Sequence, residues 1–276
     1  MKVLINEDII DRKNTSIDIE DRGYQFGDGV YEVVRVYDGE IYELDGHVER
    51  FFRSATEIDL VINQSASELK KNIEQVMQEN NLTDGGIYFQ VTRGVSPRKH
   101  HYDRSVKSYL VAYPLYFTRP LENQKTGVTA ITVEDLRWLR CDIKSLNLLY
   151  NVMMKQKAHD ENAFEGIFIR DGIVTEGTST NVFIVKNGVY KTHPVNNKIL
   201  NGITRQRIIK LLKENNQSVE EVEITQNELY DADEVFISST TSEVMPICEI
   251  DGKKIGDGQV GEKTKEIYNT LIAYIG

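Results

Sequence analysis

Tight-turn dipeptides recur along this chain, most of them in its second half. Each separates two short runs rich in β-branched and aromatic residues: Asp38-Gly39, Asp171-Gly172, Asn187-Gly188 and Asp251-Gly252. Such dipeptides favour β-hairpins, because Asn, Asp and Gly accept the positive φ angles of two-residue turns. The second half is therefore predicted to form a barrel-like β core with a few helices packed outside it.

Helical spacing of apolar residues appears in several segments. Residues 45–60 and 65–81 show it in the first half, and Ser65 with Glu68 forms a capping box before the second of these. Strands are predicted after them, at 86–94 and 107–115. In the second half, the pattern predicts helices at 147–160, 204–215 and 260–274.

A change of texture marks the predicted domain boundary. Residues 117–127 hold a Pro, a Gly and several polar side chains without periodicity. We therefore predict a two-domain α/β (α+β) chain. It has an N-terminal α/β domain at 1–117, a linker at 118–124 and a C-terminal pseudobarrel domain at 125–276.

Composition excludes several classes of protein. The chain has 276 residues, 40% of them hydrophobic, and a formal net charge of −10, so it can bury a core but is a poor generic binder of nucleic acid or anionic membranes. Its two cysteines, Cys141 and Cys248, form no CxxC or Cys/His cluster, and no metal site or disulfide framework is predicted. No run is long enough to span a membrane, and MKVLINEDIIDR has acids where a secretory signal needs an apolar run. We expect a cytoplasmic protein.

Three turns in the second half could bind a phosphate. Residues 200–212 place a Gly and Thr204 before an amphipathic helix, residues 236–243 end a strand in hydroxyl residues, and residues 174–181 mix Gly, hydroxyls and one acid, Glu176. Helix starts and hydroxyl-rich turns can bind anions. Each also has an ordinary interpretation, an N-cap by Thr204 or a solvated loop. Neither GxxxxGK[ST] nor GxGxxG is present, so the usual nucleotide motifs are absent.

Two further features could carry chemistry. Lys144 lies between Ile143 and Leu146, where burial would lower its pKa and make it nucleophilic, although a lysine that reaches solvent is the simpler alternative. Arg98 and His100 would share a face of an extended chain and could bind a carboxylate. A basic surface turn is the alternative for this pair.

Six motifs, in order, resemble one family over nearly the whole chain. They are DRGYQFGDGVYEVVRVYDG (21–39), YFQVTRGVSPRKHH (88–101), EDLRWLRCDIKSLN (134–147), TEGTSTNVF (175–183), NGITR (201–205) and SSTTSE (238–243). The chain resembles the fold type IV pyridoxal-phosphate (PLP) aminotransferases, and among them the enzymes that act on D-amino acids.

This resemblance implies a role for each matching residue. Lys144 would form the Schiff base with PLP and act as general base and acid, and Glu176 would face the pyridine nitrogen. The phosphate would be held by Arg50, Ile203, Thr204 and Thr240, with Ser239 a weaker candidate. The substrate carboxylate would be bound by Tyr31, Arg98 and His100; Lys99 and His101 receive no role.

Glu32 is a second acid with a buried pattern, on a strand. It ranks below Glu176, which we place in a loop among the candidate phosphate turns. A carboxylate near the ring nitrogen would raise the pKa of that nitrogen, as the chemistry requires.

The implied reaction is a ping-pong transamination through an internal aldimine at Lys144. The expected pairs are D-alanine with pyruvate and D-glutamate with 2-oxoglutarate. In the family, the arm at 98–100 serves the neighbouring subunit, so a homodimer is implied. The alternatives are a branched-chain L-aminotransferase, an aminodeoxychorismate lyase of the same fold, or a non-catalytic metabolite-binding protein. The arm argues against the first two, and Lys144 in its motif against the third.

Overall fold

The computed structural model describes all residues from 1 to 276, and they divide into two compact units. The first comprises Met1–Thr118 with Ile143–Asn147, and the second comprises Arg119–Asp142 with Leu148–Gly276. The segment that carries Lys144, expected with the C-terminal domain, thus groups with the first unit.

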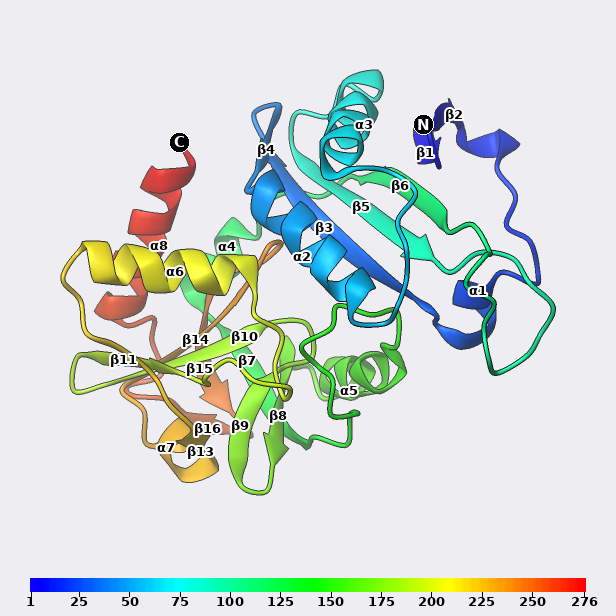
Figure 1. The fold of residues 1–276 in the computed structure, drawn as a ribbon. Helices are drawn as coiled ribbons and strands as arrows, with labels where there is room; N and C mark the ends of the chain where they lie inside the picture. Colours follow the sequence, from blue (N-terminus) through cyan, green and yellow to red (C-terminus); the bar gives the residue numbers. More distant parts are fainter. The chain divides into compact units, whose positions relative to one another are not determined.

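A six-stranded antiparallel sheet forms the first unit, in the order β2-β1-β6-β5-β3-β4. The strands are β1 (Lys2–Ile5), β2 (Asp8–Asp11), β3 (Gly29–Tyr37), β4 (Glu40–Tyr42), β5 (Gly85–Thr92) and β6 (Tyr109–Leu115). The helices are α1 (Arg22–Phe26), α2 (Leu44–Thr56) and α3 (Ala66–Glu79), and a short 3₁₀ turn spans Arg12–Asn14. Within this unit, α2 and α3 cover one face of the sheet (Figure 1).

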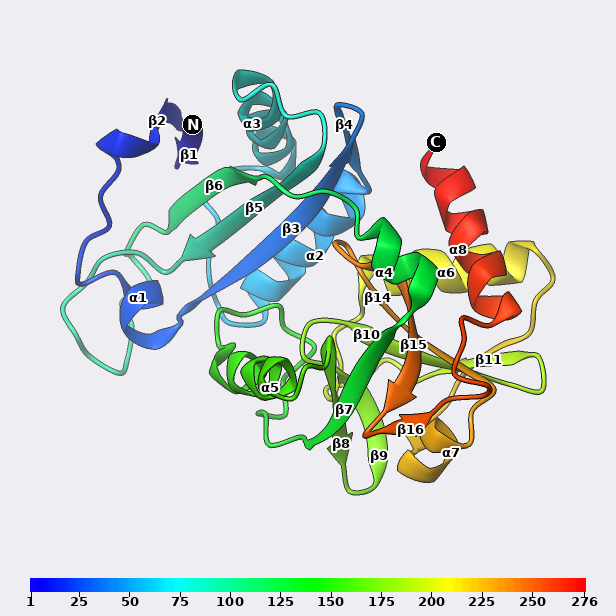
Figure 2. The same ribbon diagram turned by 180° about the vertical axis from the view of Figure 1, so that it is seen from behind.

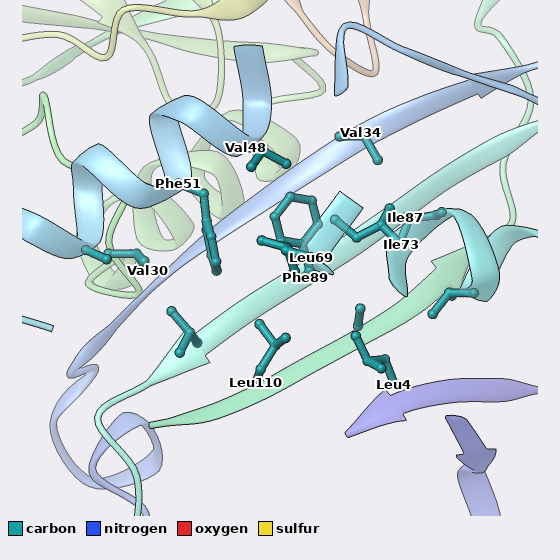
Figure 3. Packing of buried hydrophobic residues seen from close by; sticks show 14 of the residues in the cluster. Leu4, Val30, Val34, Val48, Phe51, Leu69, Ile73, Ile87, Phe89 and Leu110 are labelled. Atoms are coloured by element: carbon teal, nitrogen blue, oxygen red, sulfur yellow. The ribbon is translucent and has the colours of Figure 1, made fainter. Parts of the chain in front are cut away.

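The core of the first unit lies between that sheet and its two helices. Val48 and Phe51 of α2 and Leu69 of α3 are fully buried against strand residues such as Phe89 (Figure 3). The predicted capping box at Ser65 and Glu68 is confirmed. The spacing that predicted both helices therefore reflects their burial against the sheet.

Ten strands form the sheet of the second unit, with parallel and antiparallel pairs. The strands are β7 (Val128–Glu134), β8 (Glu165–Arg170), β9 (Ile173–Gly177), β10 (Asn181–Lys186), β11 (Val189–Thr192), β12 (Val219–Glu221), β13 (Ile224–Thr225), β14 (Glu234–Ser239), β15 (Glu243–Ile250) and β16 (Lys253–Lys254). The order is β12-β11-β10-β14-β15-β7-β8-β9-β13, with β16 beside β15. Because β9 also contacts β10, the sheet curls into a partial barrel (Figure 2).

Helices α5 (Leu149–Asp160), α6 (Ile203–Glu214) and α8 (Glu262–Ile275) occupy the three regions predicted in this half, and they pack on the outside of the sheet. Two short helices, α4 (Leu121–Thr126) and α7 (Gln226–Tyr230), were not predicted. The four hairpin predictions are confirmed, since all four dipeptides join paired antiparallel strands. No helix is long and apolar enough to cross a membrane.

Candidate active site

Lys144 lies on a segment that pairs with the start of β3. Its carbonyl accepts a hydrogen bond from the backbone N–H of Tyr31 at 3.0 Å, and Ser145 bridges Val30. The backbone N–H of Lys144 donates to Ser54 Oγ at 3.3 Å. Its half-buried side chain places Nζ 4.2 Å from the ring centroid of Tyr31. This cation–π contact holds the amine over the phenol.

Tyr31 belongs to a row of aromatic rings on the sheet. Its ring stacks on Tyr88 at 5.6 Å, and Tyr88 meets Tyr113 at 5.1 Å. The hydroxyl of Tyr88 donates to Gln90 Oε1 at 2.7 Å, and burial raises the pKa of this phenol. The stack therefore fixes one face of Tyr31, while Lys144 contacts its ring.

Arg50 is buried against the strand below its helix. Its Nε and Nη2 donate to the two oxygens of Glu32 at 2.7 and 2.9 Å, and His47 Nδ1 lies 2.7 Å from Glu32 Oε2. Arg50 therefore does not lie on a solvated face of α2: its exposed fraction is 8% and that of Glu32 is 0%. Burial alone would raise the pKa of Glu32, but the charges of Arg50 and His47 lower it to about 2.

Replacing Glu32 with glutamine should destabilise the fold, because it leaves the Arg50 guanidinium buried without its anion. The expected loss is about 3–5 kcal/mol of unfolding free energy. The pKa of Glu32 is about 2 in the folded protein and 4.5 ordinarily. The difference in unfolding free energy between the native protein and the variant is therefore full above pH 4.5 and shrinks as the pH falls toward 2. Chemical denaturation of both proteins at pH 7 and pH 3.5 measures this; an equal gap at the two pH values would contradict it.

Arg98 and His100 both lie beside Phe26. The guanidinium carbon of Arg98 is 4.4 Å from the Phe26 ring centroid, and the His100 ring is 5.8 Å from it. Both side chains are exposed. No hydrogen bond, ion pair or ring contact joins them to Tyr31 or Lys144. The three predicted carboxylate binders thus fall into two groups within one chain.

Glu176 lies on β9, so its expected place in a loop is wrong. Its carboxylate is buried and accepts from Arg137 Nη1 at 2.5 Å, from Asn181 Nδ2 at 3.2 Å and from the N–H of Leu200 at 2.9 Å. Burial raises the pKa of Glu176, and the Arg137 charge opposes that shift. A carboxylate can accept about four hydrogen bonds, so three protein donors leave room for one more.

Arg137 is itself fixed from behind. Its Nε and Nη2 contact the two oxygens of Asp135 at 2.8 and 2.9 Å, and Arg170 also reaches Asp135 at 2.9 Å. The guanidinium carbon lies 4.2 Å from the ring centroid of Phe168. This network sets the position of the cation beside Glu176.

Asn181 connects Glu176 to the start of α6. Its amide donates to Glu176 and, at 2.9 Å, to the Leu200 carbonyl. Gly202 is required here, because a Cβ at this position would lie 2.2 Å from the side-chain oxygen of Asn181. The helix start is thereby held close to the ring of polar groups around Glu176.

Gly202 is the N-cap of α6, and no side chain caps this end. The alternative of an N-cap by Thr204 is therefore wrong, and the first-turn N–H groups of Ile203 and Thr204 make no hydrogen bond to the chain. Free N–H groups at the positive end of a helix such as α6, which has 12 residues, can bind an anion.

The hydroxyl-rich turn after β14 lies in the same unit. Asn181 pairs with Ser238 across β10 and β14, and Ser238 Oγ is buried without a hydrogen-bond partner. Ser239 Oγ accepts from the N–H of Ser242 at 3.0 Å, while the half-buried Thr240 hydroxyl makes no hydrogen bond to the chain. One unit thus brings together a buried acid, a helix start and a turn with free donors, which fits a group that carries a basic nitrogen and a phosphate.

Comparison with known proteins decides the family. Residues 29–250 match the model of the family described as amino-transferase class IV. A D-alanine aminotransferase of Bacillus licheniformis is 52% identical over 271 residues, 98% of this chain and 96% of that protein. One from Staphylococcus epidermidis is 50% identical over 276 residues, 99% and 98% of the two chains.

The chain belongs to the class IV aminotransferases. The resemblance and the fold type predicted from the sequence are thereby confirmed. Among solved structures, the Escherichia coli branched-chain amino acid aminotransferase superposes with a TM-score of 0.93 at 27% identity. The match covers 99% of this chain and 93% of that one. A putative 4-amino-4-deoxychorismate lyase from Legionella pneumophila has a TM-score of 0.87 at 26% identity, and the match covers 96% of this chain and 97% of that one.

Three residues that contact predicted site residues of this class IV aminotransferase were not predicted from the sequence: Arg137 and Asn181, which contact Glu176, and Tyr88, which contacts Tyr31. Each lies inside a motif already noted, between 134 and 147, 175 and 183, or 88 and 101. Only their contacts distinguish them from neighbouring polar residues, and the contacts of Arg137 and Tyr88 join segments far apart in the chain.

Proposed function

We propose that this class IV aminotransferase uses PLP to move amino groups between D-amino acids and 2-oxo acids. D-Alanine with 2-oxoglutarate would give pyruvate and D-glutamate. The observation that carries the proposal is the identity of about half of all positions, over nearly the whole chain, with curated D-alanine aminotransferases. Incubation of the protein with D-alanine, 2-oxoglutarate and PLP, followed by detection of both pyruvate and D-glutamate, tests it.

PLP, when bound, supplies an electron sink that stabilises negative charge at the substrate Cα. In our proposal, Lys144 would hold the cofactor covalently, and its Nζ would be the base that takes the proton from the substrate Cα and the acid that returns it. Glu176 would accept a hydrogen bond from the pyridine nitrogen. The phosphate would be bound by the N–H groups of Ile203 and Thr204 and the hydroxyl of Thr240, with Arg50 and, more weakly, Ser239.

The geometry of Glu176 supports its role. Arg137, Asn181 and Leu200 donate to its two oxygens, the Arg137 charge favours the ionised carboxylate against its burial, and one acceptor position is left for a further donor. A protonated ring nitrogen would supply that donor, and the opposite charges would stabilise each other.

Glu176→Gln should slow removal of the Cα proton, because a neutral amide does not hold a proton on the ring nitrogen. We expect kcat to fall by about a hundredfold or more, with little change in the affinity for PLP. Single-turnover rates with D-alanine and Cα-deuterated D-alanine measure the proton-transfer step. An unchanged rate for that step would exclude the assignment.

Arg50→Ala should weaken PLP binding by about 1.5–3 kcal/mol if Arg50 donates a charged hydrogen bond to the phosphate. Because Arg50 also pairs with Glu32, the same change should lower stability. Glu32→Gln separates the two effects, since it lowers stability but keeps the guanidinium. PLP titration of both variants at matched folded fraction is the measurement; equal affinities would leave Arg50 a structural role only.

We further propose a homodimer in which Arg98 and His100 serve the partner subunit's site. Two observations support this. Within one chain the pair does not contact Tyr31 or Lys144, and the first unit exposes Ile17, Ile19 and Tyr24, whose exposed fractions are 52%, 78% and 77%. Tyr31, in this arrangement, would share the substrate carboxylate with the arm of the partner.

Two predictions from the sequence remain as such. We still propose that the chain has two domains, at 1–117 and 125–276, joined by a linker at 118–124. A cytoplasmic location agrees with two cysteines that form no disulfide.

A further inference from the structure

The arm that carries Arg98 and His100 has no backbone-to-backbone hydrogen bond to another segment beyond its first few residues. It runs from the end of β5 at Thr92 to the start of β6 at Tyr109, and its backbone pairs with other segments only at Arg93, Gly94 and Ser96. Two exposed side chains on such a segment can hold a fixed direction only if other side chains anchor the backbone.

Arg22 is that anchor. It is 4% exposed, and its Nη1 and Nη2 donate to the carbonyl oxygens of Lys99 and His100 at 2.7 and 3.3 Å. These carbonyls belong to the two peptide planes that flank the His100 Cα. One rigid guanidinium therefore orients both planes, and with them the direction in which the His100 side chain leaves the backbone.

The guanidinium of Arg22 is fixed on its other side. Its Nε donates to Asp28 Oδ2 at 2.8 Å, and Asp28 also binds Arg93 Nε at 2.9 Å. Arg93 in turn donates to the carbonyls of Ile58 and Asp59 at 2.7 and 2.8 Å. This chain of contacts connects the arm to the end of α2.

Phe26 completes the arrangement. The guanidinium carbon of Arg22 lies 4.7 Å from its ring centroid, and Arg98 and His100 contact the same ring. Arg22 thus contacts both the backbone at 99 and 100 and the Phe26 ring against which the side chains of Arg98 and His100 pack.

We infer that Arg22 is a positioning residue that directs Arg98 and His100 toward a substrate carboxylate. The inference rests on the proposed function, in which that pair binds the carboxylate. Arg22 itself needs no contact with the substrate. Its contribution is the planar fork, which a lysine of the same charge cannot reproduce.

The test compares Arg22→Met and Arg22→Lys holoenzymes with the native one. Propionate, which has the carboxylate of alanine but no amine, probes carboxylate binding as a competitive inhibitor. Both variants should bind propionate about tenfold or more weakly, and kcat/KM for D-alanine should fall by about ten- to a hundredfold. Ethylamine, the carboxylate-free counterpart of alanine, should lose less than threefold in kcat/KM by the same reasoning.

Arg104→Gln is the matched control. Arg104 lies on the same arm, but its side chain is 74% exposed and pairs with Asp59 instead of the backbone at 99 and 100. It should leave propionate binding unchanged. The retained visible absorbance of bound cofactor shows that a variant is folded; if Arg22→Met is not, Arg22→Lys decides the question.

Native propionate binding in both folded variants would overturn the inference, and so would an equal loss toward ethylamine and D-alanine, which indicates general disruption. Native-like behaviour of Arg22→Lys alone would show that charge and not the fork matters, and would overturn it too. Failure of the native enzyme to convert D-alanine would instead contradict the proposed function, and propionate binding, followed then by the change in absorbance of the bound cofactor, would still report on Arg22.

Discussion

Lys144→Ala is expected to abolish the covalent link to PLP and almost all turnover. The amine lies over the Tyr31 ring, and its backbone is held at three consecutive positions by the start of β3 and by Ser54. An alanine leaves no group there to move the Cα proton, so kcat should fall by at least about a thousandfold.

Two readouts check this prediction. The visible absorbance of the native protein should bleach with borohydride and leave the cofactor attached, whereas the variant should release it on denaturation. Lys71→Ala serves as the control, because Lys71 is an exposed lysine on α3. Retention of a covalently bound cofactor with near-native turnover in Lys144→Ala would refute the role of Lys144.

Arg98→Ala is expected to lower kcat/KM for D-alanine by about ten- to a thousandfold. Its guanidinium offers a planar pair of donors to a carboxylate, and its packing on Phe26 fixes their direction. Truncation should therefore cost transition-state orientation as well as binding, and it should hurt D-alanine far more than ethylamine.

Lys99→Ala is the neighbouring control for Arg98. Lys99 is exposed on the same arm, and only its backbone carbonyl is bound by Arg22. Steady-state kinetics of both variants with D-alanine should separate them by at least about tenfold. An Arg98→Ala enzyme as fast as the native one would show that Arg98 does not bind the substrate carboxylate.

Local patterns sufficed for much of the fold. The dipeptide Asp171-Gly172 predicts the β8–β9 hairpin because a two-residue turn depends only on residues within it, and Ser65 with Glu68 predicts the start of α3 for the same reason. The six-residue α4 was missed because so short a helix shows no full period of apolar residues.

The local sequence pattern did not show which charged residues are buried. Nothing in the helical pattern of α2 shows that Glu32 lies beneath Arg50, since the two residues meet only when the helix packs on β3. Glu176 was assigned to a loop because Gly and Thr surround it, although it extends β9. Thr204 has the side chain of an N-cap residue, but the N-cap of α6 is Gly202, two residues earlier, and no side chain caps this end.

The roles of Arg22 and Arg137 could not be deduced from one sequence, because each links segments far apart in the chain. Arg22 reaches residues 99 and 100, and Arg137 reaches Glu176. The resemblance located the motifs, and the contacts distinguish the residues within them.

The position of carboxylate binding sets the hand of the substrate. A single lysine takes a proton from one face of a planar intermediate, so the position at which the carboxylate is bound decides which enantiomer presents Cα–H to Lys144. The direct measurement is the initial rate of pyruvate formation from D-alanine and from L-alanine, each with 2-oxoglutarate and saturating PLP. We expect a rate with D-alanine at least about a hundredfold higher; comparable rates, or a preference for L-alanine, would contradict the account.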